Sequence, residues 1–196
     1  MRPVLYCIRH GETSWNSEQR FQGRVEVDLN PNGVGQARRN GQRLAGLLAG
    51  SAEGFRFVSS PQLRARRSME IIRAELGLDP SAYEADARLV EVAYGDWQGL
   101  TEAEIRRDYP ELHALRARDK WNFVPPGAEA ESYAMQARRV AAWLAEAVRP
   151  TVVVSHGGVM RCLLVLAAGW DPDRAGQFEV PQDRILRVED GRIEWL

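Results

Sequence analysis

The chain has 196 residues, and a domain typically has about 150, so we expect residues 1–196 to form a single domain. Hydrophobic residues make up 44% and charged residues 27%, which excludes a disordered, collagen-like or coiled-coil chain. The 26 basic and 27 acidic residues leave a net charge of -1, so the summed charge gives no reason to bind nucleic acid or an anionic membrane. Any anion site must therefore be local.

The cysteines and the apolar runs indicate the cellular compartment of the protein. Cys7 and Cys162 each lie inside an apolar run, as is typical of buried thiols in a reducing compartment rather than of a disulfide framework. The apolar stretch Val159 to Ala168 is about half the ~20 residues that a membrane span requires, so we interpret it as a core helix. No small-residue cleavage pattern follows Val4 to Ile8. We expect a cytoplasmic protein.

Strand and helix patterns alternate in the first half of the chain. Val4 to Ile8 and Phe55 to Val58 are short apolar runs, as expected of strands buried on both faces of a sheet. Between them, the leucine spacing predicts a helix from Asn32 to the C-cap Gly50. The tripeptide Ser59-Ser60-Pro61 then predicts a helix with a hydroxyl N-cap and a proline in its first position.

The second half begins with a loop-rich segment, residues 79–99, which includes a short strand before Leu89. Thr101 followed by Glu104 predicts a capping box that starts a helix. The other expected elements are helices over Leu112 to Asp119, Ser132 to Val148 and Val159 to Ala168, a strand over Thr151 to Val154, and a hairpin of Ile185 to Val188 and Ile193 to Leu196 around Asp190-Gly191.

This alternation predicts an α/β fold built from βαβ units. Such units give a three-layer α/β/α sandwich with a mainly parallel sheet and helices on both faces. Sheets of this kind bind ligands at the carboxyl ends of their strands. Since His10 follows the first strand and His156 follows the strand over Thr151 to Val154, the two imidazoles could meet at that edge.

The residues near these histidines favour a phosphoryl ligand. Arg9 precedes His10, and Arg64 lies at the head of the helix that follows the second strand. Guanidinium groups match phosphate oxygens bidentately and keep their charge, and helix N-termini add backbone donors. Two imidazoles and two guanidiniums at one edge would therefore suit a phosphoryl group.

The run Arg9-His10-Gly11-Glu12-Thr13-Ser14-Trp15-Asn16 resembles the signature of the histidine phosphatase superfamily, also called phosphoglycerate mutase-like. Further blocks follow in the order of that family and span nearly the whole chain. They are Phe21-Gln22-Gly23, Leu29-Asn30 with Gly33 and Gln36-Ala37, Ser59-Ser60-Pro61 with Leu63-Arg64-Ala65, Leu89-Val90-Glu91 with Tyr94-Gly95-Asp96-Trp97-Gln98-Gly99, and Ser155-His156-Gly157-Gly158.

The resemblance implies a phosphoglycerate mutase-like fold and a role for each matching residue. His10 would be the nucleophile that becomes a phosphohistidine, and Glu91 would protonate the leaving oxygen and then activate water. The phosphoryl group would be surrounded by Arg9, Arg64 and His156, and its oxygens would be held by Asn16, Gln22, Gly23 and Gly157. No metal or other cofactor is implied, and the substrate would be a small phosphorylated metabolite.

The same blocks leave two activities open within the family. A cofactor-dependent phosphoglycerate mutase shares them, but such mutases are usually longer and carry Thr at the position of Gln22. The chain is therefore interpreted as a phosphatase, in which water captures the phosphoryl group. Four charged residues, Arg24, Glu26, Arg118 and Lys120, are candidates for the site entrance.

Other interpretations belong to different classes of protein. His10, His156 and Glu91 could form a two-histidine, one-carboxylate metal site, but two arginines beside it would repel a cation. A non-catalytic phosphate-binding module would need neither a nucleophile nor an acid. His113 lies in a charged helix and is interpreted as solvated. A homodimer through an exposed sheet edge or the C-terminal strand is an expectation only.

Overall fold

The computed structural model describes residues 3–48 and 50–196. Six strands form one sheet in the order β3-β2-β4-β1-β5-β6. The strands are β1 (Leu5–Arg9), β2 (Arg56–Ser59), β3 (Glu84–Ala85), β4 (Thr151–Ser155), β5 (Ile185–Glu189) and β6 (Arg192–Trp195). β3, β2, β4 and β1 pair in parallel, whereas β5 and β6 are antiparallel.

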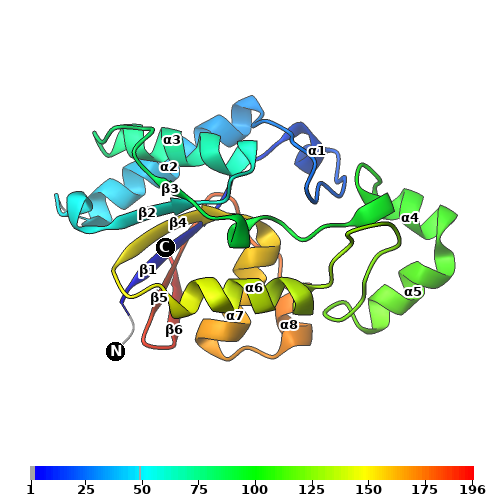
Figure 1. The fold of residues 1–196 in the computed structure, drawn as a ribbon. Helices are drawn as coiled ribbons and strands as arrows, with labels where there is room; N and C mark the ends of the chain where they lie inside the picture. The colour runs from blue at the N-terminus through cyan, green and yellow to red at the C-terminus, as the bar shows by residue number, and fades with distance from the viewer. Residues whose placement is uncertain (1–2, 49) are drawn as a thin grey trace.

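Helices cover both faces of this sheet (Figure 1). One face carries α2 (Pro31–Leu48) and α3 (Leu63–Glu75), and the other carries α6 (Tyr133–Ala145), α7 (Gly157–Ala168) and α8 (Pro172–Gln177). The short helix α1 (Ser14–Ser17) follows β1. The predicted α/β fold with three layers and a mainly parallel sheet is confirmed.

Alternation along β1 explains why its residues 5–8 are all apolar. Leu5 and Cys7 of β1 pack into the core under α6 and α7, whereas Tyr6 and Ile8 pack into the core under α2 and α3. A strand buried on both faces exposes no side chain to water, so every position favours an apolar residue. The two cysteines, which the sequence predicts to be buried, are free thiols inside the first of these cores.

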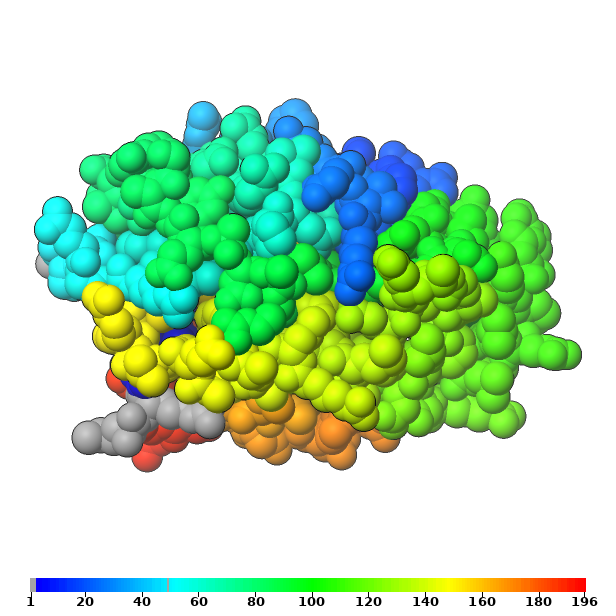
Figure 2. All heavy atoms as spheres, viewed as in Figure 1, coloured from blue at the N-terminus to red at the C-terminus, as the bar shows by residue number. Residues whose placement is uncertain are grey.

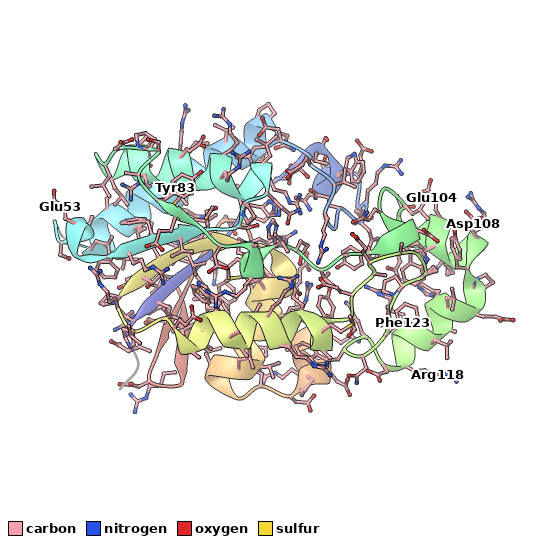
Figure 3. The ribbon with its side chains drawn as sticks, in the orientation of Figure 1. Glu53, Tyr83, Glu104, Asp108, Arg118 and Phe123 are labelled. Carbon is pink, nitrogen blue, oxygen red and sulfur yellow. The ribbon has the colours of Figure 1, made fainter. Side chains whose placement is uncertain are left out.

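A smaller group of helices extends beyond the sheet (Figures 1 and 3). We call residues 102–120 the cap; it contains α4 (Glu102–Asp108) and α5 (Pro110–Arg118). Thr101 caps α4 and forms the predicted capping box with Glu104. In Figure 3, the cap lies at the end of the molecule opposite Glu53 and Tyr83.

Most other predicted elements are confirmed with small shifts of their ends, but the predicted start of α3 is wrong. The helix begins at Leu63, and Pro61 precedes it. The Ser60 hydroxyl is not an N-cap because it lies 2.7 Å from Nε2 of His156. A carboxylate oxygen of Glu26 accepts from the Leu63 amide instead, at 2.7 Å.

The C-terminal region contains one helix that the sequence analysis did not predict, α8 (Pro172–Gln177), whose N-cap is Asp171. The hairpin β5–β6 forms as predicted around Asp190 and Gly191, both with positive φ (47° and 77°). None of the helices in the described ranges combines the length and hydropathy that crossing a bilayer requires.

Candidate active site

The two histidines meet at the carboxyl edge of the sheet, as the sequence predicts. β1 and β4 are parallel neighbours, with Arg9 paired to Ser155 at their ends. The next residue of each strand is a histidine, and the His10 amide donates to the Ser155 carbonyl at 2.8 Å. The ring centroids of His10 and His156 lie 5.1 Å apart, edge to face. Pairing of the two strands therefore brings together residues 146 positions apart in the chain.

The hydrogen bonds of His10 determine which ring nitrogen is free to react. Its Nδ1 lies 2.7 Å from the Gly11 carbonyl oxygen, which can only accept, so Nδ1 carries the proton. Nε2 then holds the lone pair and accepts from Nε of Arg64 at 3.2 Å. Burial and the nearby Arg64 and Arg9 charges lower the pKa of His10 well below its usual range. His10 is thus a neutral imidazole with a basic nitrogen facing the cavity.

Arg64 joins His10 to the neighbouring loop. It lies in the first turn of α3, is 1% exposed, and donates to the carbonyls of Gly23 (2.8 Å) and Val25 (2.9 Å). Gln62 adds a bond to the same Gly23 carbonyl at 3.0 Å. The buried guanidinium therefore fixes the loop that carries two of the predicted phosphate-binding residues.

Arg9 is held from the other side of the cavity. Its Nη1 donates to the Val180 carbonyl at 2.7 Å, while its buried Nε has no partner among the described residues. Burial, with Arg161 nearby, lowers the pKa of Arg9 to about 10, so the side chain remains a cation at neutral pH. A buried N–H without an acceptor is costly, and an anion in the cavity would satisfy it.

His156 lies behind His10 rather than on the cavity wall. It is 0% exposed and is the N-cap residue of α7. Its Nε2 is 2.7 Å from the Ser60 hydroxyl, and its buried Nδ1 has no partner in the described part of the chain. Burial and the charge of Arg64 lower its pKa well below the usual range.

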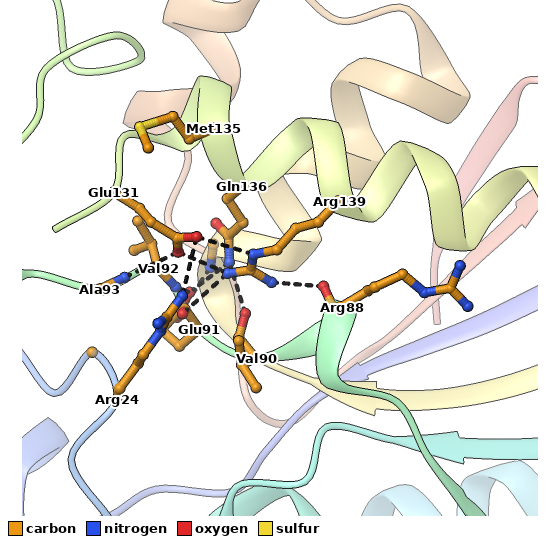
Figure 4. A network of polar contacts seen from close by, with 12 residues as sticks. Arg24, Arg88, Val90, Glu91, Val92, Ala93, Glu131, Met135, Gln136 and Arg139 are labelled. Carbon is orange, nitrogen blue, oxygen red and sulfur yellow. Dashed lines mark hydrogen bonds and ion pairs between the residues drawn. The ribbon is translucent and has the colours of Figure 1, made fainter. Parts of the chain in front are cut away.

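Three donors hold the Glu91 carboxylate, and two of them, Val92 and Gln136, are labelled in Figure 4. One carboxylate oxygen accepts from the Val92 amide at 2.8 Å and from the Gln136 side chain at 3.2 Å. The other accepts from the Gly158 amide in the first turn of α7, at 3.2 Å. Arg139 supports the segment by donating to the Glu91 carbonyl at 3.2 Å. The carboxylate is therefore fixed at the cavity wall by α6 and α7.

The predicted phosphate-binding residues also reach the cavity. Asn16 uses its side-chain oxygen to accept from Thr13 and from Gln182, which leaves its NH2 group for a ligand. The Gln22 side-chain oxygen is buried without a partner among the described residues. Gly23 has a φ of +54°, which favours glycine, and a Cβ there would lie 2.2 Å from the Gln98 side-chain oxygen, so Gln98 would have to move to admit it.

These groups surround one cavity of about 470 Å³. Eight of the nine predicted site residues line it, and His156 alone does not. Lys120, which the sequence places at the entrance, lines it too, but Arg24, Glu26 and Arg118 do not. That prediction is wrong for those three because Arg24 pairs with Glu131, Glu26 caps α3, and Arg118 is exposed on the cap.

The Arg24–Glu131 pair closes one side of the site. Its shortest N–O distance is 3.1 Å, and Glu131 also pairs with Arg139 at 3.0 Å. On the molecular surface, the blue segment near residue 24 touches the yellow-green segment near residue 130 (Figure 2). Arg24 therefore holds the loop after Gln22 against the segment that precedes α6.

Sequence reasoning missed the segment over residues 178–182. The Phe178 carbonyl accepts from Arg161 at 3.1 Å and the Val180 carbonyl accepts from Arg9. Gln182 donates to the His10 carbonyl and to Asn16, both at 3.1 Å. Arg161 itself lines the cavity. Its place one turn into the helix that starts at Gly157 was the available signal.

The site does not fit the metal interpretation. In the described part of the chain, no group of three or more His, Cys, Asp or Glu side chains is arranged to hold a metal ion. His10 Nδ1 is committed to a carbonyl and its Nε2 faces the Arg64 guanidinium, whose charge opposes a cation there. The free donors of Arg9 and Asn16 point to an oxyanion instead.

The fold and the site together define an enzyme of the histidine phosphatase type, and the comparisons agree. A sequence model of the histidine phosphatase superfamily (branch 1) matches residues 5–195. The chain belongs to this superfamily.

Relatives and solved structures carry different names within the family. The chain is 31% identical over 183 residues to a 2,3-bisphosphoglycerate-dependent phosphoglycerate mutase of Azorhizobium caulinodans, with 88% of this chain and 85% of that protein covered. A mycobacterial glucosyl-3-phosphoglycerate phosphatase, solved with VO3, superposes with a TM-score of 0.79 at 26% identity, over 99% of this chain and 96% of that one. An α-ribazole phosphatase from Shigella flexneri shares the fold at 22% identity, with a TM-score of 0.78 over 95% and 90% of the two chains.

Proposed function

We propose that the protein is a metal-independent phosphomonoester hydrolase that works through a phosphohistidine on His10. The observation that carries this proposal is the hydrogen bonding of His10. Its protonated Nδ1 is fixed by a carbonyl, and its unprotonated Nε2 faces a cavity lined by Arg9 and Arg64. A positioned lone pair beside two cations is what attack on a phosphate dianion needs.

The reaction has two steps. In the first, the Nε2 lone pair of His10 attacks phosphorus, the bond from phosphorus to the leaving oxygen breaks, and Glu91 gives that oxygen a proton. In the second, Glu91 takes a proton from water, the water oxygen attacks phosphorus, and the P–N bond breaks to release inorganic phosphate. The charge on the equatorial oxygens is stabilised by Arg9 and Arg64.

The supporting residues have distinct roles in this scheme. Asn16, Gln22 and the backbone amides at Gly23 and Gly157 hold phosphoryl oxygens, since these groups lie at the cavity wall beside His10. His156 packs edge to face against His10, and its ring keeps the nucleophile in place. The substrate is a small phosphorylated metabolite, and the protein works in the cytoplasm.

A phosphoglycerate mutase is the second candidate because the curated relatives carry that name at 26–31% identity. This chain covers 82–88% of those relatives, so they are not much longer, and length alone does not separate the two activities. Two observations favour hydrolysis. The solved relative at 26% identity is named a phosphatase, and Gln22 stands where the resemblance implies Thr in a mutase.

The proposal is tested by phosphate release in excess chelator from p-nitrophenyl phosphate and 3-phosphoglycerate. We expect hydrolysis by the wild type, loss of it in His10→Ala, and normal activity in the control His113→Ala, whose ring pairs with Glu102 on the cap. Interconversion of phosphoglycerates that needs bisphosphoglycerate, with little phosphate release, would identify a mutase. Binding of phosphate without either activity would identify a non-catalytic module.

A further inference from the structure

Gln62 is a buried residue that joins two segments of the cavity wall. It immediately precedes α3, is 4% exposed, and does not itself line the cavity. Its side-chain Nε2 donates to the Gly23 carbonyl at 3.0 Å, and its Oε1 accepts from the Glu91 amide at 2.7 Å. Because a carbonyl only accepts and an amide N–H only donates, these two partners fix which way the Gln62 side chain points. One amide group thus connects Gly23 to the proposed acid.

On the Gly23 side, the peptide unit between Gly23 and Arg24 is held at both ends. Its oxygen accepts from Gln62 and, at 2.8 Å, from Nη2 of Arg64, while its N–H donates to the Gln98 side chain at 2.7 Å. The amide of Gly23 itself has no acceptor among the described residues. This amide is therefore left for a phosphoryl oxygen, as the proposed function requires.

On the Glu91 side, Gln62 makes the shortest contact that comes from outside the segment 90–92. The bond from the Glu91 amide to Gln62 is 2.7 Å long. The carboxylate accepts from Gln136 and from Gly158 at 3.2 Å, near the long end of the range for N–H···O bonds. Arg139 reaches the Glu91 carbonyl at the same distance. Gln62 is therefore the closest link between Glu91 and the rest of the protein.

A second connection between Glu91 and the Gly23 loop is weaker. It runs from Arg24 through Glu131 and Arg139 to the Glu91 carbonyl (Figure 4). The Arg24 side chain is 39% exposed, and ion pairs open to water contribute little. A buried donor that loses its acceptor, in contrast, costs the full desolvation of that group. The buried connection through Gln62 should therefore determine how the two segments sit relative to each other.

We propose that Gln62 is a positioning residue that holds Glu91 where it can protonate the leaving oxygen. It acts through the Glu91 backbone and does not touch the reacting atoms. This inference rests on the proposed function, which makes Glu91 the general acid. Without the Gln62 amide, the Glu91 N–H loses its acceptor, whereas the Gly23 carbonyl keeps Arg64. The acid should therefore shift while phosphate binding is largely retained.

Two substrates with different leaving groups test this inference. The alcohol of O-phosphoethanolamine needs a proton as it leaves, whereas nitrophenolate leaves p-nitrophenyl phosphate without one. The value of kcat/KM includes only the steps up to release of the leaving group, so later activation of water by Glu91 does not enter. In Gln62→Met and Gln62→Leu, the ratio of kcat/KM for O-phosphoethanolamine to that for p-nitrophenyl phosphate should fall by about tenfold.

Inhibition by inorganic phosphate separates a displaced acid from a site that has loosened as a whole. In both Gln62 variants, the inhibition constant should change by less than about threefold, because Arg64 still holds the Gly23 carbonyl. Ile72→Val is the matched control, since Ile72 is buried in the same helix and does not line the cavity. It should leave the ratio of kcat/KM values unchanged. This ratio, measured within each variant, is insensitive to a general loss of active protein.

An unchanged ratio in both Gln62 variants would overturn the inference. A fall in only one of them would also overturn it, because methionine and leucine both lack the amide and differ only in shape. So would an equal fall in Ile72→Val, or a rise of about tenfold or more in the phosphate inhibition constant.

Failure of the proposed function appears separately, as a lack of p-nitrophenyl phosphate hydrolysis by the wild type or as hydrolysis that survives in His10→Ala. In that case, hydrogen exchange of the Glu91 amide still tests whether Gln62 holds this segment. Exchange that is at least about tenfold faster in both Gln62 variants than in the wild type would support the contact. Exchange at the wild-type rate would reject it.

Discussion

Substitution of Arg9 by methionine should greatly reduce activity without destabilising the protein. The fall in the Arg9 pKa to about 10 corresponds to about 3 kcal/mol against the charged guanidinium in the folded state. The variant loses the charged hydrogen bond to the Val180 carbonyl, a contribution of about 1.5–3 kcal/mol. The two effects nearly cancel, so the free energy of unfolding should be unchanged or higher by up to roughly 1.5 kcal/mol.

Chemical denaturation at pH 7, with and without inorganic phosphate, measures this balance. Phosphate at ten times its Kd should stabilise the wild type by about 1.4 kcal/mol, but Arg9→Met should gain little. The value of kcat/KM should fall by at least about 100-fold, as expected for a lost donor to the transition state. Arg118→Met, at an exposed position, should stay within about 0.5 kcal/mol of the wild type.

The reasoning is refuted if Arg9→Met loses more than about 1 kcal/mol of stability, because the guanidinium would then be a net stabilising group in the empty site. An equal stabilisation of the variant and the wild type by phosphate would also refute it. It would show that Arg9 does not contact the bound anion.

Three further outcomes are expected. Gly23→Ala should destabilise the fold by more than Gly77→Ala does: both positions have positive φ, but only at Gly23 would a Cβ displace a neighbouring side chain, that of Gln98. Gly23→Ala should also lose activity, and equal losses of stability in the two variants would contradict the clash. As the pH is lowered from 6.5 to 5.5, the histidines of the unfolded chain bind protons that the buried His10 and His156 do not. The free energy of unfolding should therefore fall by up to about 1.4 kcal/mol per buried histidine per pH unit. The variant His156→Gln should reduce this slope. Gln136→Met should lower kcat/KM for O-phosphoethanolamine by about tenfold through Glu91. The substitution should lower kcat/KM for p-nitrophenyl phosphate less, since nitrophenolate leaves without a proton. Equal losses for the two substrates would argue against an effect on Glu91 as the general acid.

The sheet and the meeting of the histidines could be predicted because each depends on a local pattern. Residues 5–8 of β1 and 152–154 of β4 are apolar since both faces of these strands are covered, and a histidine directly follows each strand. Parallel strands place their carboxyl ends at the same edge. Once the strands were recognised, the position of both histidines followed without any knowledge of the loops.

The start of α3 could not be predicted because its N-terminal partners come from distant segments. Ser60 has the residue type of an N-cap, but His156 competes for its hydroxyl. The cap comes from Glu26, 37 residues away in the chain. Tertiary contacts override the local signal here, whereas the capping box at Thr101 is self-contained and was predicted correctly.

The contacts that residues 178–182 make with the site could not be predicted from the sequence, for a different reason. Two of its contributions are backbone carbonyls, those of Phe178 and Val180, which any residue type could supply. The helix α8 before it did carry a signal, since Asp171-Pro172 is an N-cap followed by a proline in the first turn. The local structure was therefore predictable, but its role at the site was not.

The central place of β1 has a consequence for how the chain folds. The strand that carries Arg9 to the site is made first, yet its two neighbours in the sheet are β4 and β5, from the last quarter of the sequence. Contacts so distant in sequence form late, because the loop-closure entropy must be overcome before they stabilise anything. During synthesis, β1 must therefore wait without its sheet neighbours until β4 and β5 have emerged. Completion of the C-terminal hairpin and assembly of the phosphoryl site should thus be one cooperative event.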